Sequence, residues 1–482
     1  MGFDNFRQIN EFIKENKIKI IDFKQIDLAG RWHHLTIPVD SFSEELLERG
    51  IGFDGSSYGF LTVEKSDMVF IPDITSAFID PISESPTMSM IGDIFSITKD
   101  GYQRFEDDPR YIAEKCERYL LETGISDLCL FGPEFEFYIL DNVEFRIEPN
   151  NIEAHLDSVQ AAWNTFDSSY DDYKKNRGYK VLAHKGYHTD LPYDISFDLR
   201  NKMVLLLEEN DIPVKYHHSE NGGPGQVEIE VDFTTLREMG DRTQKLKYII
   251  KNTAIKNGKT ATFMPKPFFD EAGSGMHVHF QMFKNNKPLF YDKKGYSCLS
   301  DAALYAIGGI LRHSPALMAF TNPTINSYKR LVPGYEAPVS ICFAEANRSA
   351  VIRIPGYTID PGEKRFEYRP PDASANPYLC FSVILMAAID GIKNKIDPSA
   401  EGFGPFDKNM YKLTEEEKKQ VKMLPATLEE AARALEKNHD FLLAGGVFTE
   451  SIINSQLVQL RSDIKEFNVI PHPLEYKKYF DL

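Results

Sequence analysis

The feature that most constrains the fold is an alternation of acidic and aromatic residues in FGPEFEFYIL, residues 131–140. Successive side chains of a β-strand point to opposite faces, so Glu134 and Glu136 share one face while Phe135 and Phe137 share the other. On a lone strand of an antiparallel sheet, such a carboxylate pair most often faces water. The alternation therefore predicts a strand with one buried face, and the rest of the chain decides what the acidic face does.

The same alternation recurs in other strand-like runs, namely QVEIEV, GMHVHF, NRSAVIRIP and KRFEYRP. Their polar positions are Glu228, Glu230, His277, His279, Arg353, Glu367 and Arg369. A further acidic residue, Glu220, precedes Glu228 across a glycine-rich loop, NGGPGQ. If these runs form one curved sheet whose apolar faces are covered by helices, their polar faces converge.

Converging carboxylates would require cations, because like charges raise one another's pKa or demand neutralisation. The candidate ligands are Glu134, Glu136, Glu220, Glu228, His277 and Glu367. Oxygen ligands without thiolates favour Mg²⁺ or Mn²⁺ over Zn²⁺. Carboxylates beside several arginines are also the combination expected for handling phosphate. The pattern alone leaves a second interpretation open, in which the strands scatter and these groups are ordinary structural or surface residues.

Length and composition narrow the function classes. The 482 residues suffice for roughly two to four domains, and 42% hydrophobic content argues against global disorder. A net charge of −17 weighs against a broad nucleic-acid or anionic-membrane surface. Five scattered cysteines and a charged N-terminal stretch without an apolar signal core are typical of a soluble protein of the reducing cytoplasm.

The chain divides at a polar junction, TKDGYQRFEDDPR. Residues 1–108 are expected to form a small α/β unit, and residues 109–482 a larger α+β body with long helices at 236–258 and 300–320. The polar, aromatic stretch 143–187 is too long for a typical connection and is expected to be a functional or interface loop.

Longer runs resemble glutamine synthetase of the bacterial type I class: FDGSS, GPEFEF, KTATFMPKP, GSGMHVH, NSYKRLVPGYEAPV, NRSAVIRIP and RPPDASANPYL. They occur in the family's order over nearly the whole chain. The resemblance implies an α+β fold with an N-terminal β-grasp domain, residues 1–108, and a C-terminal catalytic domain, residues 109–482. In that domain a curved antiparallel sheet would form a funnel-shaped active site. It also implies a dodecamer of two stacked hexameric rings, with sites between neighbouring subunits.

The activity implied by the resemblance is ATP-dependent ligation of ammonia to the side-chain carboxylate of glutamate, through γ-glutamyl phosphate, with two or more Mg²⁺ or Mn²⁺ ions per site. Glu136, Glu220 and Glu228 would bind the first metal, and Glu134, His277 and Glu367 the second. Asp54 of the adjacent subunit would deprotonate ammonium in a pocket with Ser57, Tyr187 and Glu220. The other implied residues are Glu336 as the flap residue, Gly273, Arg330 and Arg369 for glutamate, Arg348 and Arg353 for the transferring phosphate and ATP, and His279 and Arg365 for the nucleotide.

Two departures from the family pattern qualify these expectations. Ala272 replaces the usual asparagine in the loop that lines the glutamate site, which predicts weaker glutamate binding. Tyr411 in DKNMYKL matches a tyrosine that an adenylyltransferase modifies in the longer type I subclass, but Lys412 and Thr414 break that motif. An unmodified loop tyrosine is therefore an equal alternative. At the level of activity, the alternatives are a γ-glutamyl-amine (polyamine) ligase of the same superfamily and a catalytically inactive relative.

Overall fold

The structure, a computed structural model, describes residues 2–60, 66–164, 178–332, 337–406, 410 and 421–479. Its N-terminal part is built on a seven-stranded sheet of order β2-β1-β6-β4-β3, with β5 and β7 also paired to β6. These strands are β1 (Ile20–Ile26), β2 (Trp32–Pro38), β3 (Ile51–Asp54), β4 (Asp67–Pro72), β5 (Phe78–Ile79), β6 (Thr87–Thr98) and β7 (Gly101–Arg104). β1 and β6 run parallel, and the other pairs are antiparallel.

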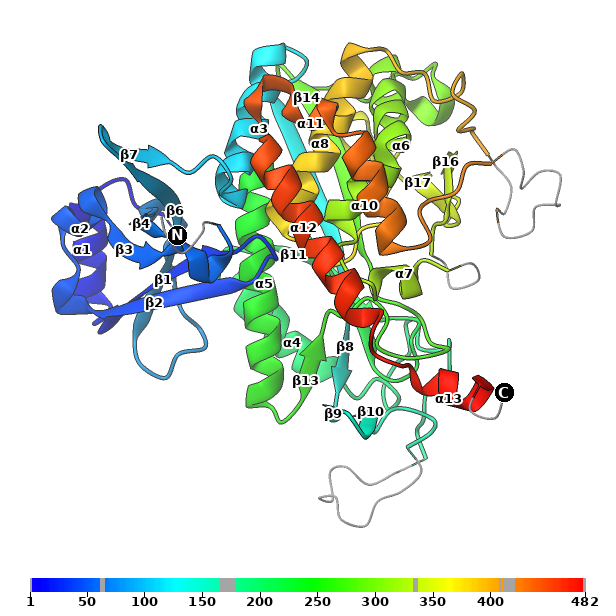
Figure 1. Ribbon diagram of the computed structural model, residues 1–482, viewed down its shortest axis with the longest axis horizontal. Coiled ribbons are helices and arrows are strands. Elements are labelled where there is room, and N and C mark those ends of the chain that lie inside the picture. Colours follow the sequence, from blue (N-terminus) through cyan, green and yellow to red (C-terminus); the bar gives the residue numbers. More distant parts are fainter. Residues whose placement is uncertain are drawn as a thin grey trace.

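Helices α1 (Phe6–Glu15) and α2 (Glu44–Arg49) accompany this sheet, at the left of Figure 1. Asn5 caps α1 by accepting a hydrogen bond from the backbone N–H of Gln8. One face of α1 buries Ile9 and Ile13 in a core that also contains Phe23 from β1. The N-terminal sheet thus has a hydrophobic core of its own.

The larger part is built on a nine-stranded sheet of order β11-β12-β8-β14-β18-β17-β16, with β13 paired to β8 and β15 to β14. Its strands are β8 (Leu128–Leu140), β11 (Val214–Ser219), β12 (Gln226–Val231), β13 (Thr260–Thr262), β14 (Met276–Lys284), β15 (Lys287–Pro288), β16 (Ser340–Glu345), β17 (Ala350–Ile354) and β18 (Phe366–Tyr368). The sheet is antiparallel, as predicted, except at one edge, where β16 and β17 run parallel.

Long helices cover the apolar face of this sheet (Figure 1). The helices of this part are α3 (Pro109–Thr123), α4 (Phe197–Glu208), α5 (Leu236–Lys256), α6 (Asp301–Thr321), α7 (Ser327–Arg330), α8 (Pro377–Lys393), α10 (Leu428–Lys437), α11 (Asp440–Leu443), α12 (Glu450–Phe467) and α13 (Pro473–Tyr479). Asn376 caps α8 and Pro377 is its first residue, which suits proline because the N–H it lacks has no partner within the helix at that position. Within the described residues, no helix has the length and hydropathy needed to cross a bilayer.

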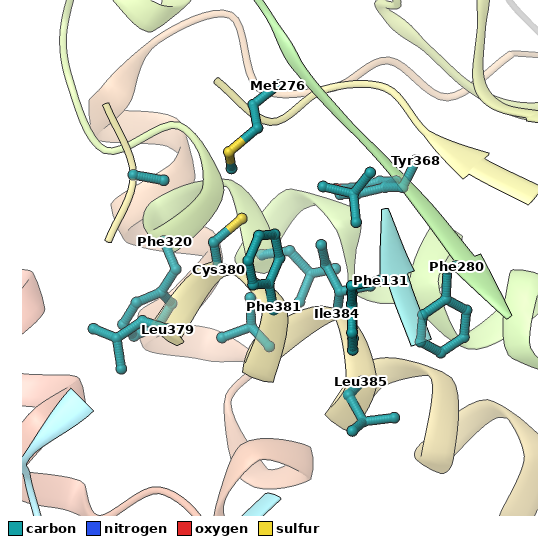
Figure 2. Packing of buried hydrophobic residues seen from close by; sticks show 14 of the residues in the cluster. Phe131, Met276, Phe280, Phe320, Tyr368, Leu379, Cys380, Phe381, Ile384 and Leu385 are labelled. Atoms are coloured by element: carbon teal, nitrogen blue, oxygen red, sulfur yellow. The ribbon is translucent and has the colours of Figure 1, made fainter. Parts of the chain in front are cut away.

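Aromatic packing fixes the sheet against α8, as Figure 2 shows. The rings of Phe131 on β8 and Phe381 on α8 lie 5.3 Å apart, and Phe131 also contacts Phe280 on β14 at 5.2 Å. All three side chains are fully buried. Because each buried aromatic side chain contributes about 1.5–3 kcal/mol, this core holds the middle strands, and therefore their opposite face, in a fixed position.

A buried charge network joins the two parts. Arg110 in the first turn of α3 donates to Asp93 of β6 at 2.7 Å, to Asp73 after β4 at 2.7 Å, and to Asp241 of α5 at 2.9 Å. The Arg110 side chain is 1% exposed. The polar junction seen in the sequence is thus a buried electrostatic contact between the N-terminal sheet and α5.

Stretch 143–187 differs in part from the expected loop. Two strands, β9 (Asn142–Glu148) and β10 (Asn151–Asp157), form an antiparallel hairpin there. Its short strands alternate polar and apolar residues, which the composition of the longer stretch obscures. Residues 165–177 lie outside the described part of the chain.

Candidate active site

A cavity of about 810 Å³ opens on the polar face of the larger sheet. Strands β8, β12 and β14 supply acidic and imidazole side chains to its floor, and the segments at 187–190 and 215–221 form another wall with further groups of both kinds. Arginines from α7, β17 and the loops beside β17 and β18 complete it. The predicted site residues that line it are Glu134, Glu136, Tyr187, Glu220, Glu228, Gly273, His277, Arg330, Arg348, Arg353 and Arg369.

The alternation in β8 divides its side chains as predicted. Glu134 and Glu136 line the cavity, whereas Phe135 and Phe137 are fully buried in the main core. The strand register places a further acidic residue beside this pair, because Glu136 is paired with Glu228 of β12. The floor of the cavity is therefore a set of laterally adjacent polar positions on hydrogen-bonded strands.

The first acidic group contains Glu136, Glu220 and Glu228, whose candidate ligand oxygens lie within 4.8 Å of one another. Burial, followed by the charges of Glu134 and Glu136, raises the pKa of Glu228 well above its ordinary value. Three carboxylates at this distance form the all-oxygen donor set that hard divalent cations prefer.

The second group contains Glu134, His277 and Glu367. His277 Nδ1 lies 3.0 Å from a Glu134 oxygen and 3.5 Å from a Glu367 oxygen. Burial alone would raise the pKa of Glu134, but hydrogen bonds to His277 and His279 hold it well below the ordinary value. A mixed oxygen and imidazole set of this kind also fits a divalent cation, so both groups suit the metals that the sequence predicts.

Arginines neutralise part of the second group. Arg353 and Arg369 each donate to a different oxygen of Glu367 at 2.5 Å. Burial opposes ionisation of Glu367, but the charges of Arg369 and Arg353 outweigh it and lower its pKa to about 2. Glu367 itself is fully buried; it lies beneath the lining of the cavity and aims these two arginines.

The glycine at 273 lets an arginine approach the floor. A Cβ at this position would lie 2.6 Å from Arg330 Cγ, a distance that real contacts do not reach. Arg330 donates to the carbonyl of Pro370 at 2.7 Å, and its Nη2 lies 3.2 Å from His277 Nε2. Ala272 also lines the cavity, and its carbonyl accepts a hydrogen bond from Tyr138 at 2.6 Å.

Several predicted residues lie elsewhere in this chain. The carboxylate of Asp54, at the end of β3, accepts hydrogen bonds from Ser56 and, at 3.0 Å, from Ser57. Hydrogen bonds from Ser56 and then Ser57 lower the pKa of Asp54 to about 2. Among the described residues that line the cavity, the lowest-numbered is Glu134, so the N-terminal sheet supplies none.

The two residues predicted to contact the nucleotide do not line the cavity either. His279 is fully buried, with Nε2 2.8 Å from Glu134. Arg365 is buried and lies over the rings of Phe233 and Tyr357. Glu336 and Tyr411 fall outside the described residues.

Some lining residues were not predicted as site residues. His188 stacks on Tyr187 at 4.0 Å and meets His218 at 4.4 Å, and His218 Nε2 lies 3.5 Å from Glu228. The run HHSE contained a signal for His218, because alternate positions of a strand share a face and His218 precedes Glu220 by two residues. Glu230, which is fully buried and does not line the cavity, groups with Glu134 and His279 and shares the polar face of β12 with Glu228.

Comparisons with known proteins agree with this architecture. The family model described as "Glutamine synthetase, beta-Grasp domain" matches residues 17–97, and "Glutamine synthetase, catalytic domain" matches residues 106–479. A curated glutamine synthetase of Streptomyces filamentosus is 46% identical over 485 residues and covers 100% of both chains. One of Aquifex aeolicus is 46% identical over 477 residues, covering 98% of both. The structure of a glutamine synthetase of Plasmodium falciparum superposes with a TM-score of 0.90 at 28% identity, covering 99% of both chains. The predicted fold class and the predicted resemblance are confirmed.

Proposed function

The chain belongs to the glutamine synthetase family of glutamate–ammonia ligases, and from that premise we propose that the cavity on β8, β12 and β14 is its active site. The observation that carries the proposal is the pair of adjacent acidic groups, Glu136–Glu220–Glu228 and Glu134–His277–Glu367, which are faced by arginines; all of their members except the buried Glu367 line the cavity. This arrangement suits transfer of a phosphoryl group to a carboxylate acceptor.

The two groups would hold Mg²⁺ or Mn²⁺, which, when bound, would neutralise charge on the phosphate oxygens of ATP. The arginines of the chain would bind the anionic groups of the two substrates. Arg348 and Arg353 line the wall and are assigned to the transferring phosphoryl group, where fixed positive charge is most effective in a site closed to water. Arg330 and Arg369 are assigned to the carboxylates of glutamate, because guanidinium groups bind carboxylates through paired hydrogen bonds.

The chemistry explains why phosphorylation must come first. A carboxylate does not react with ammonia because oxide is a very poor leaving group. Transfer of the γ-phosphoryl group of ATP to the glutamate side chain forms an acyl phosphate and releases ADP. Neutral ammonia then attacks the acyl carbon, phosphate leaves, and glutamine results. The acyl phosphate must be shielded from water, a task that we assign to Glu336.

We assign the removal of a proton from ammonium to Asp54 of a neighbouring subunit, with Ser57 and Tyr187 completing the pocket. Replacing Asp54 with asparagine is expected to lower kcat/KM for ammonium by about 100-fold or more, because general bases contribute about 10²–10⁴-fold. The measurement is initial rate against ammonium concentration. Asp100→Asn, at an exposed turn of the same sheet, serves as the control.

The pH dependence gives a second test of this assignment. In the single chain, hydrogen bonds from Ser56 and Ser57 lower the pKa of Asp54 to about 2, so a carboxylate that keeps these bonds in the assembled pocket stays ionised at neutral pH. Asp54→Asn should therefore lower the ammonium rate by a similar factor across pH 6–8. A loss confined to one end of that range would contradict the assignment.

The proposed function is tested by phosphate release from ATP and glutamate with a panel of amines, in Mg²⁺ or Mn²⁺ and without either. Ammonia-dependent release of phosphate, with glutamine as product, is expected. Preference for a polyamine would instead indicate a γ-glutamyl-amine ligase. No metal-dependent release with any amine would indicate an inactive relative.

Ala272 provides a prediction about glutamate. Replacing Ala272 with asparagine adds one side-chain amide to a cavity wall, and one net hydrogen bond contributes about 0.5–1.5 kcal/mol. The KM for glutamate is therefore expected to fall by about 2- to 10-fold, with little change in kcat. Steady-state kinetics against glutamate measures this, and an unchanged KM would refute the expectation.

The remaining assignments concern the whole protein. We infer a cytoplasmic dodecamer of two hexameric rings, with the N-terminal domain at residues 1–108 and the catalytic domain at 109–482. His279 and Arg365 stay assigned to nucleotide binding, His279 through its contact with Glu134.

Adenylylation of Tyr411 is tested by incubation with an adenylyltransferase and ATP, followed by intact-mass measurement. Absence of an added AMP would exclude that modification.

A further inference from the structure

A second cavity, of about 500 Å³, lies where the N-terminal sheet meets the larger part. The turn between β1 and β2 (Leu28–Trp32) forms one side, α5 forms another, and residues of α12 and of the start of α8 close it. Gln244 of α5 donates to the carbonyl of Gly30 at 3.0 Å, and Asn376 donates to the carbonyl of Asp27 at 3.0 Å. The proposed glutamine synthetase reaction uses none of these residues.

Three cationic side chains line this cavity: Arg31, Lys247 and Lys251. The two lysines are four residues apart on α5, so they project from the same helix face. Burial, and to a smaller extent the charge of Lys251, lowers the pKa of Lys247 to about 7. Burial and the charge of Arg31 likewise lower the pKa of Lys251. Lys251 therefore feels the charges of both neighbours, one on its own helix face and one on the turn across the cavity.

Little in the described part of the chain compensates these charges. Asp463 is the one acidic residue among the described residues that line the cavity, and the charge of Asp372, outside the lining, acts on Lys247. Lys247 donates to the carbonyl of Ala373 at 2.7 Å, which leaves two of its three N–H donors. Lys251 lies 5.8 Å from the ring of Phe263. Arg31 and Lys251, with Lys247 partly protonated, thus give the lining a net positive charge, and a bound anion would raise the pKa of Lys247 and favour its protonation.

We propose that this cavity binds a phosphate-type dianion, either inorganic phosphate or the phosphate of a small phosphomonoester. The planar guanidinium of Arg31 and the ammonium groups of Lys247 and Lys251 supply donors from two structural elements, and such donors bind the several oxygens of a phosphate group. The volume exceeds that of phosphate alone and admits a small organic group beside it.

Bound phosphate would bridge the turn at residues 28–32 to α5. The turn belongs to the N-terminal sheet, and α5 belongs to the larger part, so occupancy would reinforce the contact between them. This inference goes beyond the proposed function, because neither the ligation reaction nor its metals are required for it.

The test is titration of the full-length protein with inorganic phosphate by calorimetry, in Mg²⁺ and at constant ionic strength. Because the active site also handles phosphate, wild type should bind two phosphates per chain and the double variant Arg31→Gln/Lys251→Gln one. The charge-matched control is Lys14→Gln/Lys437→Gln, at exposed positions, and it should bind two. Equal stoichiometry and affinity in all three proteins would overturn the proposal.

Four further measurements test which ligand binds and what its binding does. Succinate binding as tightly as phosphate at this cavity would overturn the assignment to phosphate. Comparison with glycerol 3-phosphate identifies the source, since tighter binding than phosphate indicates a phosphomonoester and weaker binding indicates the free ion. Amide hydrogen exchange of residues 28–32 should slow at least about threefold with phosphate in wild type but not in the double variant. The ligation rate of the double variant without added phosphate should equal that of wild type, so failure of this proposal and failure of the proposed function are separable.

Discussion

Replacing Glu136 with glutamine is expected to reduce ATP-dependent glutamine formation by at least about 100-fold, which corresponds to about 2.7 kcal/mol of transition-state stabilisation. Glutamine keeps the size of the side chain and can still accept the hydrogen bond that Glu136 receives from the N–H of Gly275 at 2.6 Å. The substitution therefore removes one negative charge from the Glu136–Glu220–Glu228 group and little else. Affinity for Mn²⁺, measured by titration, should fall with the rate.

The same substitution should have the opposite effect on the stability of the metal-free protein. Folding raises the pKa of Glu228 above its value in the unfolded chain. The contribution of Glu228 to the free energy of unfolding is therefore fully present below about pH 4 and is lost as pH rises. Removing the neighbouring charge of Glu136 lowers the pKa of Glu228 and so reduces that loss. The metal-free variant is expected to unfold at a higher urea concentration than metal-free wild type at pH 8.

Glu122→Gln, at an exposed position on α3, is the matched control, and it should change neither activity nor stability. Metal-dependent turnover that persists in Glu136→Gln would show that this carboxylate does not hold a metal. A metal-free variant less stable than wild type would show that Glu136 has a structural role beyond its charge.

Replacing Arg110 with methionine is expected to destabilise the protein by about 3–5 kcal/mol, the usual cost of removing one partner from a buried ion pair. Asp73, Asp93 and Asp241 would then remain in partly buried positions without their shared cation. Burial by itself raises the pKa of Asp73, and the charge of Arg110 is the main influence that lowers it. The largest effect should appear at the contact between the N-terminal sheet and α5.

Urea unfolding followed by tryptophan fluorescence can localise this effect. The chain has two tryptophans, and Trp32 lies 5.9 Å from the ring of Tyr248 on α5. In a Trp163→Phe background, fluorescence therefore reports on the junction. Arg118→Met, exposed on the same helix, should stay within about 0.5 kcal/mol of its parent. A destabilisation by Arg110→Met no larger than that of the control would contradict the prediction.

The parts of the fold that the sequence predicted best depend on short-range periodicity. The alternation at 131–140 predicted which side of β8 is buried, because the side-chain direction of a strand follows from residue parity alone. The long helices α5 and α6 were predicted for a similar reason. The parallel pairing of β16 and β17 could not be predicted in this way, because strand direction depends on how the intervening chain returns to the sheet. The β9–β10 hairpin was hidden by the polar composition around it.

Groups that come together from distant parts of the chain could not be predicted, either at the junction of the two parts or within the site. Arg110 belongs to a run, EDDPR, that has the composition of a polar surface junction, and its partners at 73, 93 and 241 are distant in sequence. Burial of an arginine by three such partners is a property of the tertiary structure alone. Glu230 was on the predicted polar face of β12, but only the register of β8, β12 and β14 brings it beside Glu134 and His279.

The separation of Asp54 from the cavity of its own chain has a genetic consequence. If each catalytic centre combines Glu136 of one subunit with Asp54 of the next, the Asp54→Asn and Glu136→Gln proteins each lose most of their activity, for different reasons. In a mixed ring, an Asp54→Asn chain supplies the intact cavity and an adjacent Glu136→Gln chain supplies the intact carboxylate. Two defective alleles expressed in one cell would then complement each other, and a strain that carries either allele alone would require glutamine.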